Sequence, residues 1–133
     1  MKLDIGCGIH KRGDIGIDIR EDRAVDIIAS AEHLPFRDDS FEIAVSYECI
    51  GYTEGPEDVI QSLNEGLRVS SAIEIYMWDE PRMLGELLKI PHEIQRAAYV
   101  PSWLGTPEEQ QEYEEEMEPI DWNFFCKYTY VRR

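Results

Sequence analysis

Two glycines and an aspartate near the amino terminus are the residues whose types and spacing most clearly suggest chemistry. An apolar stretch predicts a buried first strand, and it runs directly into a turn that contains Gly6 and Gly8. Because glycine has no side chain, a ligand can approach the backbone of such a turn closely. A second predicted strand, at 15–19, ends around Asp18. The pattern predicts a ligand crevice at the carboxyl ends of two neighbouring strands.

This stretch differs from the fingerprint of dinucleotide-binding proteins. The fingerprint needs a third glycine, and Lys11 stands in that place. Asp18 also follows the turn much sooner than the spacing of about 20 residues that the fingerprint requires. Nicotinamide cofactors are therefore set aside.

The remaining reactive side chains and the overall charge exclude several classes of function. The three histidines lack metal-ligand spacing and the three cysteines form no Cys-x-x-Cys pair, so we expect neither a metal site nor a disulfide framework. With 28 acidic and 13 basic residues, the net charge is −15. Such a field disfavours nucleic acid and anionic membranes as partners. Because the sequence has no signal-type segment and no apolar run of membrane length, we expect a cytoplasmic protein that does not enter a membrane.

Strands and helices are predicted to alternate in the order that positions such a crevice. Apolar and β-branched runs predict strands at 3–5, 15–19, 25–29, 41–47, 72–78 and 122–131. Helices are predicted from Pro56, over 80–99 with an irregular tail, and from Thr106 to about Met117. Between the first two strands only about one turn of helix or a tight loop fits. The order predicts one α/β domain (1–133) with a largely parallel sheet and an antiparallel final strand at or near an edge.

Several stretches resemble, in order and spacing, the motifs of class I S-adenosylmethionine-dependent methyltransferases of the type 11 kind. The stretches are Leu3-Asp4-Ile5-Gly6-Cys7-Gly8, Gly16-Ile17-Asp18, Ala31-Glu32-His33-Leu34-Pro35-Phe36 followed by 39–46, and Leu67-Arg68-Val69 before the fifth strand. The resemblance covers residues 2–78 and is weak afterwards. It implies a Rossmann-like three-layer sandwich that binds S-adenosylmethionine and transfers its methyl group to a small molecule or a protein.

The resemblance also implies which residues contact the cofactor. They are Asp4, Gly6, Cys7, Gly8, Asp18, Ser30, Ala31, Glu32 and Ser46. Asp18 is the candidate for the ribose, because a carboxylate at the end of the second strand can accept both hydroxyls. Asp4 either helps to bind the amino group of the cofactor or only hydrogen-bonds the turn. Ser30 stands where the family usually has an aspartate, which would weaken the contact to the adenine.

The residues after the fourth strand would lie beside the methyl acceptor. Glu48 or Tyr52 could act as a base there, while a solvated Glu48 and a packed Tyr52 are the plainer alternatives. Because an in-line transfer can depend on positioning alone, a missing base would not exclude catalysis. Residues 92–121 are expected on the acceptor side, where aromatic side chains would line the site or pack in the core; they are Trp103, Tyr113 and Trp122.

Three departures from the family pattern leave a second hypothesis open. The sequence starts directly at the first strand, where the family usually has a helical lid first, and we expect a small, amino-terminally truncated member. The first crossover is short, and Ser30 replaces an aspartate. The alternative is a non-catalytic, methyltransferase-like binding module or partner subunit. Apolar surface left without the lid could also favour a homodimer.

Overall fold

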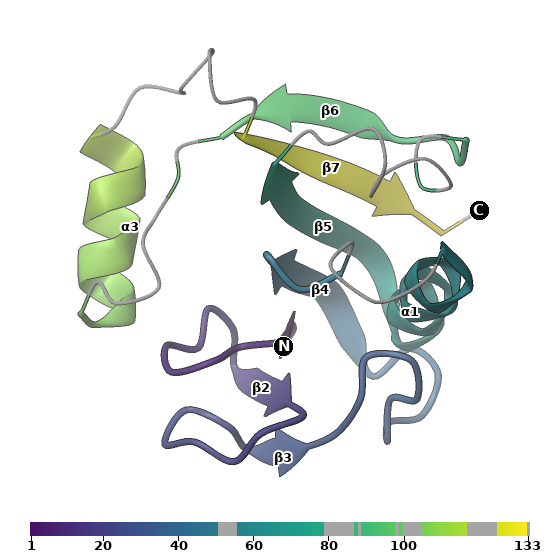
Figure 1. Cartoon of the computed structure of the whole chain (residues 1–133), viewed down its shortest axis with the longest axis horizontal. Helices are drawn as coiled ribbons and strands as arrows, with labels where there is room; N and C mark the ends of the chain where they lie inside the picture. The colour runs from purple at the N-terminus through teal and green to yellow at the C-terminus, as the bar shows by residue number, and fades with distance from the viewer. Residues whose placement is uncertain are drawn as a thin grey trace.

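In the described part of the computed structural model of the chain, seven strands form one mixed sheet (Figure 1). The structure describes residues 1–50, 56–78, 87, 89–97, 99, 105–116 and 125–132. The strands are β1 (Lys2–Ile5), β2 (Ile15–Asp18), β3 (Ile27–Ile28), β4 (Phe41–Tyr47), β5 (Ser70–Trp78), β6 (Glu93–Arg96) and β7 (Phe125–Val131). Their spatial order is β3-β2-β1-β4-β5-β7-β6. The strand order therefore reverses between β1 and β4, and ligands of open α/β sheets bind outside the carboxyl ends of the strands at such a point.

The predicted α/β fold with a largely parallel sheet is confirmed. Strands β1 to β5 pair in parallel with their neighbours, and β7 runs antiparallel to β5 and to β6. The antiparallel carboxyl-terminal strand was expected at or near an edge, and it lies one strand in from it. Residues 122–124 of that predicted strand lie outside the described residues.

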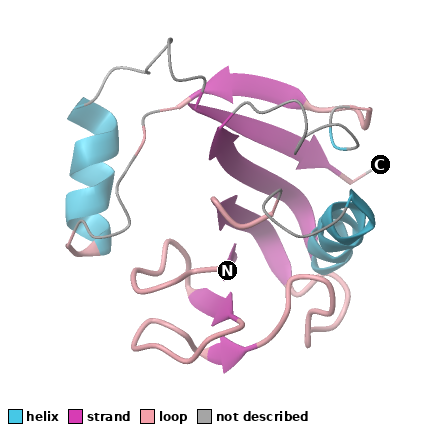
Figure 2. Cartoon of the chain, in the orientation of Figure 1, coloured by secondary structure: helices cyan, strands magenta, loops and turns pink. Residues whose placement is uncertain are grey.

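Helices α1 and α3 lie on opposite sides of the sheet (Figures 1 and 2). Helix α1 (Pro56–Val69) starts with a proline and has Glu57 and Asp58 in its first turn, where the helix dipole favours negative charge. Helix α3 (Pro107–Glu116) begins where predicted, because the Thr106 hydroxyl accepts a hydrogen bond from the backbone N–H of Glu109 at 3.3 Å. Helices α1 and α3 contribute to the outer layers of the sandwich.

The main core lies between the sheet and α1. Side chains alternate along each strand, so Leu3, Ala44 and Ile73, which face one another across β1, β4 and β5, share one face of the sheet. Helix α1 covers this face with Val59 and Leu63, both buried. This packing holds the parallel strands β1 and β4 together, so their carboxyl ends lie at the same edge of the sheet.

The opposite face of the sheet is covered differently. The connections 6–14, 19–26 and 29–40, between successive strands from β1 to β4, contain no helix. A cavity of about 1000 Å³ lies on this face, with Val45, Tyr47 and Tyr76 of the sheet on one side and Gln110 and Glu114 of α3 on the other. The connection 6–14 between β1 and β2 is a loop, one of the two forms expected for this first crossover.

Two predicted elements differ from the structure. The third strand was predicted over 25–29, and it pairs with β2 only through Ile27 and Ile28. The predicted helix with an irregular tail over 80–99 is wrong for 93–96, which form β6, while most of the rest lies outside the described residues. The strand forms because β7 offers a free edge for pairing, and local sequence carries no information about that edge.

Candidate active site

The turn after β1 has the backbone conformation that its glycines predict. Gly6 has φ 74° and Gly8 has φ 59°, both in the left-handed region that favours glycine. The N–H groups of Gly6 and Cys7 both donate to the carbonyl of Ile17, at 2.9 and 3.0 Å. The turn is thereby tied to β2 at the carboxyl edge of the sheet.

The two glycines of the turn face different surroundings. A Cβ added at Gly6 would overlap the side chain of Cys49, so this glycine makes room for the protein's own chain. A Cβ added at Gly8 would meet no atom within 4 Å. The open position, where a ligand could reach the backbone, is therefore Gly8.

Asp18 is joined directly to this turn. Its Oδ2 accepts a hydrogen bond from the Gly8 N–H at 3.0 Å, and its Oδ1 accepts one from the Arg20 N–H at 3.1 Å. An ionised carboxylate has about four acceptor positions, so each oxygen keeps capacity for a further donor. Asp18 can hold the turn and still accept hydroxyl groups from a ligand.

Asp4 points to the other face of the sheet from Leu3 and Ile5. Its side chain is buried, and its Oδ2 accepts a hydrogen bond from the backbone N–H of Arg12 at 2.6 Å. Burial raises the pKa of this carboxyl to about 6, against the opposing effect of that hydrogen bond and of the Arg12 charge. Asp4 thus holds the loop that follows the turn.

Cys7 and Ser46 are engaged within the protein. Cys7 is buried and its thiol donates to the carbonyl of Ala24 at 3.6 Å, and burial raises the pKa of this thiol to about 12. The buried Ser46 hydroxyl accepts a hydrogen bond from the backbone N–H of Ile50 at 2.8 Å. Both side chains support the chain around the turn.

Cys49 shows that the predicted acidic residues gather at one edge. Burial, followed by the charges of Asp18, Asp4 and Glu32, raises the pKa of the Cys49 thiol to about 11. The thiol also lies at the Cβ position of Gly6. The charges at the ends of β1 and β2 and in the 30–32 loop therefore all act on one half-buried cysteine, which was not among the predicted site residues.

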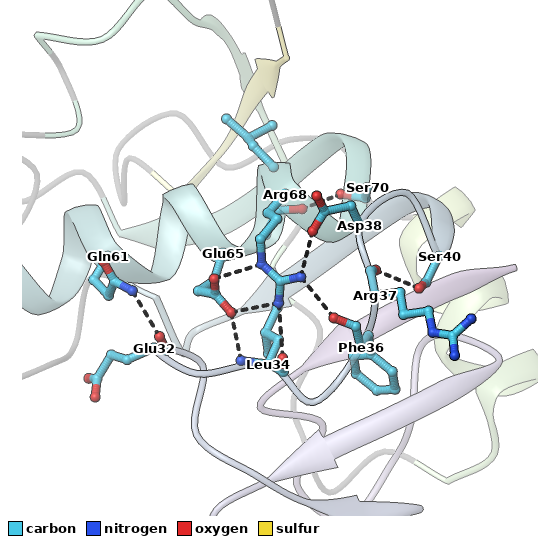
Figure 3. Close-up of polar contacts among 12 residues, drawn as sticks. Glu32, Leu34, Phe36, Arg37, Asp38, Ser40, Gln61, Glu65, Arg68 and Ser70 are labelled. Atoms are coloured by element: carbon cyan, nitrogen blue, oxygen red, sulfur yellow. Dashed lines mark hydrogen bonds and ion pairs between the residues drawn. The ribbon is translucent and has the colours of Figure 1, made fainter.

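The loop expected at the adenine is shaped by its own side chains. The Ser30 hydroxyl accepts a hydrogen bond from the Glu32 N–H at 3.2 Å and lies 3.3 Å from the Glu32 carboxylate. The Gln61 side chain, on α1, donates to the Glu32 carbonyl at 3.1 Å (Figure 3). Ala31 lies between them, partly buried against the main core.

An arginine on α1 holds the continuation of this loop, a role that was not predicted from the sequence. The Arg68 guanidinium donates to the carbonyls of Leu34 at 3.0 Å and Phe36 at 2.8 Å (Figure 3). Its Nε lies 2.8 Å from Glu65, whose carboxylate also accepts from the Leu34 N–H at 2.8 Å. The spacing of Glu65 and Arg68 was visible in the sequence, but the loop that they hold lies more than 25 residues earlier in the chain.

On the acceptor side, Glu48 is the described candidate. It directly follows β4 and has φ 55°, and its Oε1 accepts a hydrogen bond from the indole N–H of Trp78 at 3.0 Å. Tyr113 is half-buried against the cluster formed by Tyr47 and Phe125. Tyr52, Trp103 and Trp122 lie outside the described residues.

Within the described ranges, no group of three or more His, Cys, Asp or Glu side chains could hold a metal ion. No described helix has the length and apolar character needed to span a membrane.

Comparison with known proteins identifies the fold and finds a partial match to one family model. Residues 16–72 match the family model described as a methyltransferase domain. A search of curated proteins finds no sequence match. The chain is similar to a Thermotoga maritima structure described as a SAM-dependent methyltransferase and possible histamine N-methyltransferase, at 19% identity and a TM-score of 0.64, covering 99% of this chain and 82% of that one.

Two further solved structures share the fold. One is a Burkholderia thailandensis 1,6-didemethyltoxoflavin-N1-methyltransferase with bound 1,6-didemethyltoxoflavin and S-adenosylhomocysteine, at 12% identity and a TM-score of 0.61, covering 98% of this chain and 70% of that one. The other is the [4+2]-cyclase SpnF, at 14% identity and a TM-score of 0.56, covering 98% of this chain and 74% of that one. The match to the methyltransferase domain model covers less than half of the chain, and the likeness to these structures shows that the chain has a Rossmann-like fold.

Proposed function

We propose that the protein is an S-adenosylmethionine-dependent methyltransferase that acts on a small molecule or a protein. The observation that carries the proposal is the left-handed turn with open space over Gly8, hydrogen-bonded to Asp18 where the strand order reverses. The family match over residues 16–72 supports it. The cofactor would supply a methyl group made electrophilic by a sulfonium.

Each part of the site has a role in this proposal. The backbone at Gly8 lies against the amino-acid part of the cofactor, and Asp18 accepts the ribose hydroxyls. The 30–32 loop contacts the adenine, with Ser30 as the weaker substitute for an aspartate. Asp4, Cys7 and Ser46 act indirectly, because their side chains already hold the turn and its neighbours.

Titration calorimetry with S-adenosylmethionine and with S-adenosylhomocysteine tests the proposal. We expect both ligands to bind the folded protein, and we expect Asp18→Asn to weaken both about tenfold, because the charge-assisted hydrogen bonds to the ribose become neutral. A folded sample that gives no heat with either ligand would refute the proposal. Thermal unfolding with and without ligand checks the result, since binding to the native state raises Tm.

A non-catalytic, methyltransferase-like module or partner subunit is the second candidate. Two observations favour it: no helix connects the strands from β1 to β4, and a large cavity remains on that face of the sheet. A shared fold does not determine chemistry, and a neighbour of this chain is described as a cyclase. Binding of S-adenosylhomocysteine without methyl transfer to any acceptor tried would favour this candidate.

A further inference from the structure

The cavity of about 1000 Å³ between the sheet and α3 is separate from the residues assigned to the cofactor. The connection 6–14 lines it from Ile9 onward. Asp18, Ser30 and Glu32 are described residues that do not line it. Helix α3 stands apart from the strands in Figure 1, and the cavity lies between them. The cavity therefore has the size of a second site, one for a small organic ligand.

One wall of the cavity is basic, although the chain as a whole is strongly acidic. Among the described residues of the lining, those with a basic Lys or Arg side chain are Lys2, Lys11, Arg12 and Arg23. The whole chain has only 13 such residues against 28 acidic ones, so this wall concentrates them. Lys11 pairs with Asp26 at 3.0 Å, whereas no described carboxylate forms an ion pair with Lys2 or Arg23. The wall therefore presents positive charge to the cavity.

Arg12 is held in place within this wall. Its N–H donates to Asp4 at 2.6 Å, and its guanidinium carbon lies 3.8 Å from the centre of the Tyr47 ring. Stacking on a ring uses the face of a guanidinium and fixes its plane, while the N–H donors point outward within that plane. Arginine binds carboxylates through such in-plane donors.

Helix α3 presents the opposite charge from the other side of the cavity. Gln110 is buried and Tyr113 packs against the cluster formed by Tyr47 and Phe125, so these two residues mark the face of α3 that looks toward the sheet. Glu114 lies four residues after Gln110 and shares this face, because residues at that spacing are neighbours on a helix. Glu114 accordingly lines the cavity.

The two charged walls face each other without direct contact. Burial raises the pKa of the Glu114 carboxyl, and the charges of Arg12 and Lys2 oppose that effect. No described ion pair, however, joins either of these cations to Glu114. Opposite charges thus act on one another across a space that a ligand can fill.

The floor of the cavity between these walls is uncharged. Val45, Tyr47 and Tyr76 form it, and the two tyrosine rings lie 5.4 Å apart between centroids. Burial raises the pKa of Tyr76, so its hydroxyl stays neutral near physiological pH. Such a floor suits the uncharged middle of a ligand whose charges are at its ends.

We propose that this cavity binds a zwitterion whose two charges lie about as far apart as the ends of an extended dipeptide, about 7 Å. The carboxylate of the ligand lies toward Lys2 and Arg12, and its ammonium lies toward Glu114. A ligand with one charge would satisfy one wall and leave the other without a partner. The proposal concerns binding alone, so it does not depend on the methyl transfer proposed above.

NMR titrations of the whole chain test the ligand class, with L-alanyl-L-alanine, its amide, its N-acetyl form and L-alanine as probes. The amide lacks the carboxylate, the N-acetyl form lacks the ammonium, and one carbon separates the charges of L-alanine. We expect L-alanyl-L-alanine to bind about tenfold more tightly than each of the others, because each loses a charge-assisted contact. The amide signals of Gly13 and Gln110, which line the cavity, should shift, and that of Gly66 on α1 should not. Equally tight binding of the amide or the N-acetyl form, or no binding of L-alanyl-L-alanine, would overturn the proposal.

Variants at the two walls assign the ends of the ligand. Glu114→Gln should weaken L-alanyl-L-alanine about tenfold and leave the N-acetyl form unchanged, because that form has no ammonium. Lys2→Gln and Arg12→Gln should each weaken L-alanyl-L-alanine by a similar factor and leave its amide unchanged. Lys2→Gln keeps the contact of Arg12 with the tyrosine ring, so it serves where Arg12→Gln disturbs the fold.

Glu112→Gln is the matched control on α3. Glu112 is exposed and does not line the cavity, and the substitution removes the same charge as Glu114→Gln. It should leave the affinity for L-alanyl-L-alanine unchanged. Equal losses in Glu112→Gln and Glu114→Gln would mean that net charge, and not this cavity, attracts the ligand. Full affinity in all of the wall variants would likewise overturn the site.

Discussion

At the scale of single residues, two glycines of one turn have different tasks. Both have a positive φ, so both are needed for the shape of the turn. Only Gly6 is also needed for packing, because the Cys49 side chain occupies the place of its missing Cβ. Gly8 has open space instead, so a side chain added there would obstruct a ligand that approaches the turn.

This difference separates stability from binding. Gly6→Ala should lower the free energy of unfolding by about 2–5 kcal/mol, through left-handed strain plus the clash with Cys49. Gly8→Ala should cost only about 1–2 kcal/mol of strain and should weaken S-adenosylhomocysteine binding at least tenfold. Urea denaturation and calorimetry on both variants measure the two effects. Unchanged affinity in Gly8→Ala would show that the ligand does not approach this turn.

Asp4 predicts a pH dependence of stability. Its pKa is about 6 in the folded protein, above the ordinary value of 3.8, so the native state binds the proton more tightly than the unfolded state. This contribution to stability is present below about pH 4 and is lost as pH rises to about 6, up to about 3 kcal/mol. Asp4→Asn keeps an acceptor for the Arg12 N–H but does not titrate. Its free energy of unfolding should therefore lack this fall.

Asp26 provides the control of opposite sign. Hydrogen bonds from the Gly16 N–H and Lys11 lower the pKa of its carboxyl, so its contribution is present above the ordinary pKa and is lost as pH falls through the lowered value. Urea denaturation of Asp4→Asn and Asp26→Asn from pH 3 to 7 should give difference curves of opposite slope. Parallel curves would contradict the assignment for Asp4.

At the scale of elements, helix α1 does more than cover the sheet. Through Gln61, Glu65 and Arg68 it binds three stretches of the loop between β3 and β4, which includes the proposed adenine contact (Figure 3). Arg68 can do this because its planar fork reaches a carboxylate and two carbonyls at once. The position of the loop thus depends on the helix that follows it by about 30 residues.

Arg68→Ala should therefore destabilise the protein and weaken ligand binding together. We expect a loss of about 2–3 kcal/mol, since hydrogen bonds to two carbonyls and to Glu65 disappear, while the exposed contact to Asp38 adds little. Arg68→Lys should recover only part of this, because an ammonium lacks the fork. Urea denaturation and calorimetry give both readouts.

Arg37→Ala is the matched control for charge. The Arg37 side chain is exposed and points away from the cluster around Arg68 (Figure 3). The substitution removes the same charge as Arg68→Ala. It should leave both the free energy of unfolding and the ligand affinity within error. Equal losses in Arg37→Ala and Arg68→Ala would mean that net charge, and not the clamp on the loop, is responsible.

At the scale of the whole molecule, charge and layer order are the dominant features. The described ion pairs, such as Lys127 with Glu74 across β7 and β5, use a small share of the 28 acidic residues. The net charge of −15 therefore leaves strong self-repulsion in the folded state. Sodium chloride should raise the free energy of unfolding, because screening weakens long-range repulsion more than close pairs.

Urea denaturation at 0.02, 0.15 and 0.5 M sodium chloride measures this effect. The urea midpoint should rise steadily while the m value stays constant, since the surface exposed on unfolding does not change. Sucrose at matched osmolality controls for solvent exclusion. A midpoint that falls with salt would show that the ion pairs contribute more than the repulsion removes.

By itself, the sequence determined the local pattern: the strand that runs into Gly6 and Gly8, the strand at 41–47, and the starts of the helices at Pro56 and Thr106. These features depend on residues within a few positions of one another, where side-chain alternation, capping and turn preferences act. The glycine turn and Asp18 could be predicted as parts of one crevice because they lie close together in the sequence.

Only the tertiary structure decided what depends on pairing between distant segments. It placed Trp78 on Glu48 by aligning the ends of β4 and β5, put Cys49 beside Gly6, and brought Arg68 to the loop from 34 to 38. It also formed β6, whose sequence indicated no strand, by offering it the edge of β7. Such contacts join residues tens of positions apart, and sheet pairing sets their register where local preference has no influence.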